Sequence, residues 1–98
     1  MPLKGWIQYL PDGLDLRVLR QTVRGRLTAF SVVLIHENEC VTRYDTAHGF
    51  AHRDVLGRIS GLIEKQTCEN LSNEEAFQYA VNDLKTNYRA HHAFFLAH

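Results

Sequence analysis

The chain has 98 residues, of which 45% are hydrophobic, and its 11 basic residues balance its 11 acidic ones. This composition excludes an intrinsically disordered chain, and the length excludes a second independent core, so we expect a single domain over residues 1–98. The formal net charge of zero gives no support for binding nucleic acid through whole-molecule charge.

The first half of the chain carries the pattern of antiparallel strands separated by turns. Leu3–Leu10 is rich in aromatic residues and ends at Pro11-Asp12-Gly13, a strong turn signal. Apolar and charged residues alternate over Leu14–Val18, which predicts a strand with one buried face, and Gly25 marks the next turn. The continuous apolar run within Leu27–His36 predicts a strand in the middle of the sheet, buried on both faces.

Three shorter strands are expected after this central strand. A hairpin loop at Glu37–Glu39 leads into the antiparallel partner Cys40–Asp45, and Ala51–Leu56 and Ile59–Gln66 follow on either side of Gly57. Strict alternation along Cys40–Asp45 assigns its side chains to the two faces of the sheet. One face is expected to carry Cys40, Thr42 and Tyr44, and the other Val41, Arg43 and Asp45.

The end of the chain predicts one long helix. Ser72-Asn73-Glu74-Glu75 fits a capping box, in which Ser72 and Glu75 bond reciprocally to backbone amides. Apolar residues then recur at helical spacing over about 25 residues, roughly 37 Å, at Phe77, Val81, Leu84, Tyr88 and Phe95. We expect an α+β fold, a curved antiparallel sheet of about five to six strands with this helix packed on it. The last helical turns are expected to extend past the sheet toward a partner.

Arg43–Asp54, which reads RYDTAHGFAHRD, concentrates the residues most suited to chemistry. Such side chains cost free energy to bury unless they are paired, so the segment is either a solvated turn or a site of recognition or reaction. Cleavage of RNA without a metal needs a base for the 2′-hydroxyl proton, an acid for the leaving oxygen and a cation for the phosphorane charge. The candidate catalytic residues are therefore His48 and His52 as base and acid, Arg43 and Arg53 as phosphate ligands, Tyr44 as a stacking or hydrogen-bonding group, and Asp45 as a partner that orients a histidine.

Two other interpretations of this segment are open. The spacing D-x2-H-x3-H-x-D offers imidazole and carboxylate groups that suit zinc or a similar divalent ion, at Asp45, His48, His52 and Asp54. Alternatively, the segment is a polar turn, begun by Asp45-Thr46 and relaxed at Gly49, in which charged side chains pair on the surface. Of the two chemistries, the metal-free one is favoured, and we expect no cofactor.

Outside this segment, four arginines and two histidines are secondary candidates. The arginines lie close together and predict either a phosphate- or RNA-binding stripe or the solvated face of an element, at Arg17, Arg20, Arg24 and Arg26. His91 and His92 would join the site if the end of the helix folds over the sheet, and are otherwise ordinary helix-face residues.

The string RYDTAHGFAHRD follows the strand segment AFSVVLIHENECVT and precedes the C-terminal helix. In this arrangement it resembles small bacterial and archaeal proteins of the TumE type, and equally a sister family that shares the RYDTAHGF-H core. The resemblance spans roughly residues 27–95 and rests on a short motif, with which Arg43, Tyr44, Asp45, His48 and His52 align. TumE-type proteins are toxins of toxin–antitoxin pairs, so the resemblance implies a toxin with a cognate antitoxin, expected to be a small helix-turn-helix protein.

These features predict a toxin-like component of a toxin–antitoxin module that cleaves RNA without a metal through the Arg/Asp/His cluster at 43–54. The alternative is a non-enzymatic interaction module or accessory subunit that binds a partner protein through the same surface and the C-terminal helix. Apolar runs such as Val32–Ile35 are far too short to span a membrane, and Cys40 and Cys68 make no disulfide framework. We therefore expect a cytoplasmic protein without a membrane partner, and a homodimer is a further expectation because small domains gain stability by association.

Overall fold

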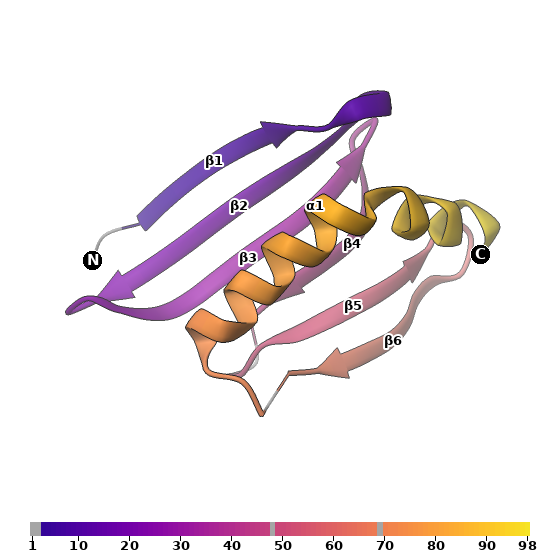
Figure 1. Cartoon of the computed structure of the whole chain (residues 1–98). Helices are drawn as coiled ribbons and strands as arrows, with labels where there is room; N and C mark the ends of the chain where they lie inside the picture. Colours follow the sequence, from indigo (N-terminus) through magenta and orange to yellow (C-terminus); the bar gives the residue numbers. More distant parts are fainter. Residues whose placement is uncertain (1–2, 48, 69) are drawn as a thin grey trace.

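The computed structural model describes residues 3–47, 49–68 and 70–98, which form one antiparallel sheet with a helix on one face (Figure 1). The strands pair in chain order, each with the next, as β1 (Leu3–Tyr9), β2 (Leu14–Val23), β3 (Arg26–His36), β4 (Glu39–Asp45), β5 (His52–Gly57) and β6 (Gly61–Thr67). A short 3-10 turn, η1 (Pro11–Gly13), joins β1 to β2, and helix α1 (Asn73–Ala97) follows β6. The fold is α+β, as the sequence predicts.

Two-residue turns explain how the central strands fold back on one another. Arg24 and Gly25 both have positive φ, 53° and 76°, and so do Glu37 and Asn38, 48° and 68°. Two successive left-handed residues are what a type I′ hairpin turn requires, and its twist matches that of the paired strands. The second turn is shorter than the predicted three-residue loop, because Glu39 already belongs to β4 and pairs with His36.

The hydrophobic core lies between α1 and the facing side of the sheet. Its residues come from alternate positions of the strands and from one stripe of the helix, as the periodicities of the two structures require. Each fully buried Leu or Phe side chain contributes roughly 1.5–3 kcal/mol. The core residues are Leu14, Leu16, Val18, Phe30, Val32, Leu34, Val41, Tyr44, Ala51, Ala76, Phe77, Ala80, Leu84, Tyr88 and Phe95.

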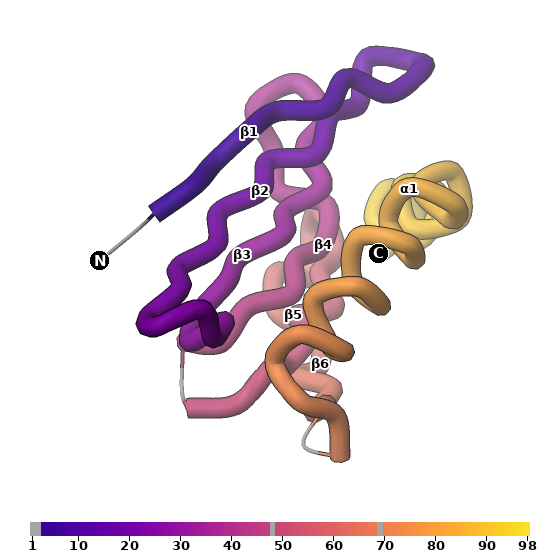
Figure 2. The backbone as a smooth tube through the Cα atoms, turned by 60° about the vertical axis from the view of Figure 1, so that its left-hand side comes forward, coloured from indigo at the N-terminus to yellow at the C-terminus, as the bar shows by residue number. Residues whose placement is uncertain are grey.

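The opposite side of the sheet, which we call the open face, carries no second helix or sheet among the described residues (Figure 2). For this reason β3 is not buried on both faces as predicted. Phe30, Val32 and Leu34 point into the core, whereas Ser31 and Val33 between them remain partly exposed. The meander therefore has one covered side and one side free for other interactions.

Strand β4 departs from strict alternation near its start. The register with β3 shifts where Leu34 pairs with Thr42 and Ile35 with Cys40, so Val41 is the extra residue of a β-bulge. Val41 is consequently part of the core, only 1% exposed, and does not share a face with Arg43 as predicted. The bulge also places Cys40 on the opposite face from Thr42 and Tyr44, with which it was predicted to share a face. Its cross-strand partner Ile35 lies on the open face of β3, and Cys40 therefore lies there too.

Helix α1 begins as the sequence predicts. Glu75 N donates to Ser72 Oγ over 3.1 Å, and Ser72 N donates to Glu75 Oε1 over 3.0 Å, so both bonds of the capping box are present. The hydrogen bond from Ser72 N to the Glu75 carboxylate lowers the pKa of Glu75. The helix then runs across the face of the sheet (Figure 1).

The end of α1 packs on the protein and does not extend freely past the sheet. Asn87 has φ −111° and ψ 20°, outside the helical range, and the helix bends there. Beyond the bend, Arg58 N donates to Phe95 O over 2.9 Å, and Ser60 N and Oγ donate to His98 O over 3.0 and 2.7 Å. These bonds satisfy carbonyl groups that a helix end leaves unpaired, so the last turns are held against the β5–β6 turn.

Candidate functional site

The sheet divides the predicted catalytic segment between its two faces. Strands β4 and β5 pair Arg43 with Asp54, Tyr44 with Arg53, and Asp45 with His52. Cross-strand partners share a face and neighbours along a strand alternate, so Tyr44 and Arg53 face α1 whereas Arg43, Asp45 and His52 lie on the open face. The predicted catalytic residues therefore do not form a single site.

The turn between these strands has the geometry of the polar-turn interpretation. Ala47 N donates to Asp45 Oδ1 over 3.2 Å, which closes an Asx-type turn, and Gly49 N donates to Thr46 O over 3.2 Å. Gly49 adopts a φ of 101°, a conformation that favours glycine. His48, predicted as base, acid or metal ligand, lies outside the described residues.

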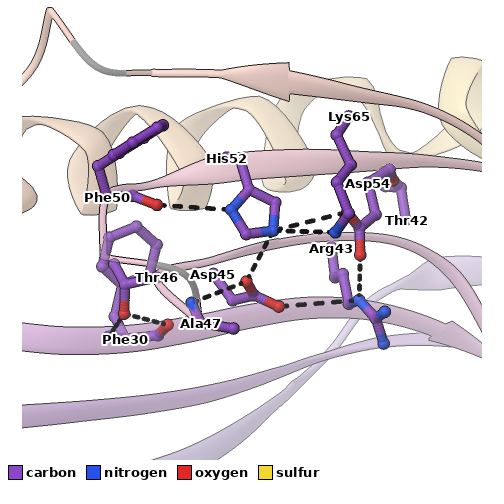
Figure 3. Close-up of polar contacts among 10 residues, drawn as sticks. All are labelled: Phe30, Thr42, Arg43, Asp45, Thr46, Ala47, Phe50, His52, Asp54 and Lys65. Carbon is purple, nitrogen blue, oxygen red and sulfur yellow. Dashed lines mark hydrogen bonds and ion pairs between the residues drawn. The ribbon is translucent and has the colours of Figure 1, made fainter.

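On the open face, five side chains form a polar cluster, which we call the open-face cluster: Arg43, Asp45, His52, Asp54 and Lys65 (Figure 3). Asp54 is its centre. Arg43 Nε donates to Asp54 Oδ2 over 2.6 Å, and Lys65 Nζ donates to Asp54 Oδ1 over 2.9 Å. His52 Nε2 lies 3.1 Å from Asp45 Oδ1 and 3.6 Å from Asp54 Oδ1.

Charge balance explains how a carboxylate can be buried in this cluster. The Asp54 side chain is 1% exposed, whereas those of its cationic partners Arg43 and Lys65 are 46% and 43% exposed. Burial alone would raise the pKa of Asp54, but the hydrogen bonds from Lys65 and Arg43 outweigh it and hold the pKa below its usual value. The cluster thus keeps Asp54 ionised and presents two anchored cations to solvent.

On the other side of the sheet, a cavity of about 400 Å³ opens between β4–β6 and α1. We call it the helix-face cavity. Its lining is polar and aromatic, and consists of Tyr44, Arg53, Gln66, Thr67, Cys68, Asn70, Leu71, Tyr79 and Asp83. Tyr44 and Tyr79 meet edge to face, with ring centroids 6.1 Å apart, and Tyr79 is 57% exposed.

A chain of hydrogen bonds joins the sheet to the helix at this cavity. Arg53 Nη2 lies 3.1 Å from His91 Nδ1, and His91 Nε2 lies 3.0 Å from Asp83 Oδ2. A guanidinium can only donate, so His91 Nδ1 is the acceptor and the ring proton is on Nε2, which donates to Asp83. Arg53 Nε also donates to Thr42 Oγ1 over 3.1 Å, which fixes the arginine on the surface of the sheet.

Asp83 receives three side-chain donors. Asn87 Nδ2 donates to Oδ1 over 2.8 Å, and Tyr44 Oη donates to Oδ2 over 2.7 Å beside the His91 bond. Burial would raise the pKa of Asp83, but the bonds from Asn87, Tyr44 and His91 lower it overall. Burial and the bond to Asp83 raise the pKa of Tyr44, so the phenol stays protonated and acts as a donor.

The four arginines predicted as a binding stripe do not share one surface. Arg17 lies on the open face and pairs with Asp15 at 3.2 Å, whereas Arg20 turns to the helix, where it pairs with Glu74 at 3.1 Å and lies 4.6 Å over the Phe77 ring. Arg24 is a turn residue and Arg26 begins β3. Alternation along β2 and the hairpin turn separate residues that are close in sequence.

Sequence reasoning missed two residues, Asp83 at the helix-face cavity and Lys65 in the open-face cluster. Asp83 has a usable signal, since Asp83, Asn87 and His91 recur every four residues and therefore share one face of a helix. Lys65 has none, because only the pairing of β5 with β6 brings it opposite Asp54. The sequence predicts that His91 joins the site if the end of the helix lies over the sheet. The helix does lie there, and His91 contacts Arg53 of the predicted segment.

Comparison with family models places the whole chain, residues 1–98, in a domain of unknown function, DUF7718. The comparisons with curated proteins and with solved structures gave no match. Among the described residues, no helix combines the length and the apolar character needed to cross a membrane. The match covers every strand of the sheet, helix α1 and both polar clusters, and the chain therefore belongs to the DUF7718 family.

Proposed function

We propose that this protein is a toxin-like enzyme of a toxin–antitoxin module, located in the cytoplasm, that cleaves RNA without a metal ion in the helix-face cavity. The observation that carries the proposal is the chain Arg53–His91–Asp83, with bonds of 3.1 and 3.0 Å, because Arg53 and Asp83 both line the cavity. A histidine held between a guanidinium and a carboxylate supplies a proton acceptor next to a phosphate ligand.

The reaction would proceed by transfer of the 2′-hydroxyl proton to His91. When a phosphate enters, Arg53 turns its guanidinium from His91 to the phosphate oxygens, and Nδ1 becomes free to act as base. The 2′ oxygen then bonds to phosphorus and the bond to the 5′ oxygen breaks. A water molecule protonates that leaving oxygen, and the hydroxide so formed takes the proton back from His91. The products are a 2′,3′-cyclic phosphate and a 5′-hydroxyl, and Asp83 stabilises the imidazolium formed in between.

The lining of the cavity supports an RNA substrate. Its volume of about 400 Å³ is within the usual range of small-ligand pockets. Tyr79 is well exposed on the cavity lining and offers a ring for stacking an unpaired base, while Gln66 and Asn70 carry amides for its polar edge. Tyr44 is a positioning residue, because its hydroxyl donates to Asp83 and orients that carboxylate.

A labelled single-stranded RNA, incubated with purified protein in excess EDTA, tests this assignment. We expect products with cyclic phosphate ends, and a loss of at least about 100-fold in rate for His91→Asn, the size of a general-base contribution. Arg53→Met should weaken RNA binding as well as the rate. The matched controls are His98→Asn and Arg89→Met, because His98 directly follows α1 and stacks on Phe94, and Arg89 lies on α1 and pairs with Asp12. Absence of cleavage by the wild type, or full activity of His91→Asn, would refute the proposal.

Expression in a host tests the toxin role separately. We expect inducible wild-type protein to arrest growth, His91→Asn to be harmless at equal abundance, and co-expression of a neighbouring helix-turn-helix gene to restore growth. Equal toxicity of the wild type and the variant would show that growth arrest does not depend on the cavity.

A second candidate function is a non-enzymatic interaction module, and the apolar residues near β1 favour it. Leu3, Ile7 and Leu19 are each half or more exposed, and β1 is an unpaired edge of the sheet among the described residues. The partner would be the cognate antitoxin or a second copy of the chain. A Leu19→Glu variant that loses co-purification with the neighbouring gene product, or loses dimerisation by light scattering, would support this function. Retained binding would count against it.

A further inference from the structure

Three ligand atoms converge on the open face of the sheet, on the side away from the helix-face cavity. Asp45, His52 and Asp54 come from the adjacent strands β4 and β5, and each offers one ligand atom that lies within 4.8 Å of those of the other two. The separations of 3.1 Å between Asp45 and His52 and of 3.6 Å between His52 and Asp54 bracket the edge of a zinc coordination tetrahedron. That edge is roughly 3.3 Å when the ligands are about 2.0 Å from the ion.

His52 and Asp54 each have a further hydrogen-bond partner of the kind that orients metal ligands in proteins. His52 Nδ1 lies 3.4 Å from Phe50 O, to which it donates when the ring carries its proton there, and this turns the Nε2 lone pair toward the two carboxylates. Arg43 holds the other oxygen of Asp54 at 2.6 Å. The side chains of His52 and Asp54 are 6% and 1% exposed, so their positions are fixed by packing.

A cation already lies at this convergence point. With His52 protonated on Nδ1, the three converging atoms are all acceptors and repel one another unless a positive charge lies among them. The Lys65 ammonium supplies that charge, 2.9 Å from Asp54 Oδ1 and 3.3 Å from His52 Nε2. Its side chain is 43% exposed on the edge strand β6, so it can swing out into solvent.

We propose that Asp45, His52 and Asp54 bind one divalent transition-metal ion of the zinc type, and that Lys65 occupies the place of this ion in the metal-free protein. The three residues supply a His-and-two-carboxylate ligand set, with a fourth position for water. Once Lys65 has left, the carboxylates of Asp45 and Asp54 together with the Arg43 guanidinium carry a net charge of −1. This negative charge favours binding of a divalent cation. The bound ion joins β4 to β5, and it takes no part in the RNA chemistry proposed for the other face.

Equilibrium dialysis of the chelator-treated full chain against zinc, read by atomic spectroscopy, tests the site directly. We expect one zinc per wild-type chain. Lys65→Met should bind zinc about tenfold tighter or more, because it removes the competing charge. Asp45→Asn should bind about tenfold weaker or more, since even loss of an outer partner costs that much. Both substituted side chains are partly exposed, and circular dichroism confirms that each variant is folded.

Two control variants separate this site from adventitious binding. Asp15→Asn removes a carboxylate from the same face but outside the cluster, and His36→Ala removes an imidazole whose ring centroid lies 4.2 Å from that of His92. Both should keep zinc affinity unchanged. Wild-type affinity in Asp45→Asn, loss of zinc in His36→Ala, or failure of Lys65→Met to bind more tightly would each overturn the proposal. The RNA assay in EDTA is independent of all these outcomes.

Discussion

The bond from Tyr44 to Asp83 gives the sharpest test of how the sheet and the helix are joined. Tyr44→Phe removes one hydroxyl that donates to a carboxylate over 2.7 Å and leaves the ring in the core. Hydrogen bonds to charged groups contribute about 1.5–3 kcal/mol to stability. Asp83 keeps its bonds from His91 and Asn87, so the loss should lie in the lower half of that range. We expect about 2 kcal/mol, or a fall in Tm of roughly 10 °C for a domain of this size.

Thermal and urea denaturation followed by circular dichroism measure this change. Tyr79→Phe is the matched control, because Tyr79 is largely exposed and its hydroxyl has no hydrogen-bond partner in the described part of the chain. It should shift stability by less than about 0.5 kcal/mol. A double-mutant cycle with Asp83→Asn should assign most of the Tyr44 effect to the pair. Equal stability of Tyr44→Phe and the wild type would refute the view that this bond fastens the helix to the sheet.

Acid should destabilise the protein in two steps, and one glycine should be intolerant of a side chain. Because the pKa of Asp54 is lowered in the folded state, its stabilising contribution is complete above the unfolded value of about 3.9 and is lost as pH falls through the folded value. Asp54→Asn should therefore flatten the steepest acid limb of unfolding free energy against pH. Burial first, and the charge of His36 second, lower the pKa of His92, so the folded protein resists protonation and stability falls as pH drops below about 6.5. His92→Gln should reduce the loss between pH 7 and pH 5 in the same denaturation series. Gly57→Ala should cost about 1–3 kcal/mol, because the added Cβ would lie 2.7 Å from the backbone carbon of His98. An unchanged Tm in Gly57→Ala would mean that the end of the helix does not rest on that strand.

The local features of the fold were predictable because they depend on neighbours in sequence. Alternation over Leu14–Val18, the apolar stripe of α1 and the reciprocal bonds of Ser72 and Glu75 are all short-range patterns, and the structure contains each of them. The prediction failed at Val41, where one inserted residue moves a side chain to the other face. It also failed for the end of α1, because the bend at Asn87 and the bonds to Arg58 and Ser60 involve distant parts of the chain.

The candidate site was predictable only in part. RYDTAHGFAHRD does supply residues to two polar clusters, but composition alone suggests one site where the sheet makes two. Tyr44 and Arg53 acquire their partners from α1, about 40 residues away in sequence, at Asp83 and His91. Lys65 reaches Asp54 only through strand pairing.

By itself, the sequence determined that the chain folds as α+β, where its turns and helix begin, and which segment holds the reactive side chains. These properties follow from local periodicity and from the cost of burying unpaired polar groups. Only the tertiary structure decided that Arg43, Asp45 and His52 lie on the open face of the sheet. It likewise decided that Tyr44 and Arg53 face the helix. Alternate side chains of a strand point in opposite directions, so the layer packed on one face determines what each of them can contact.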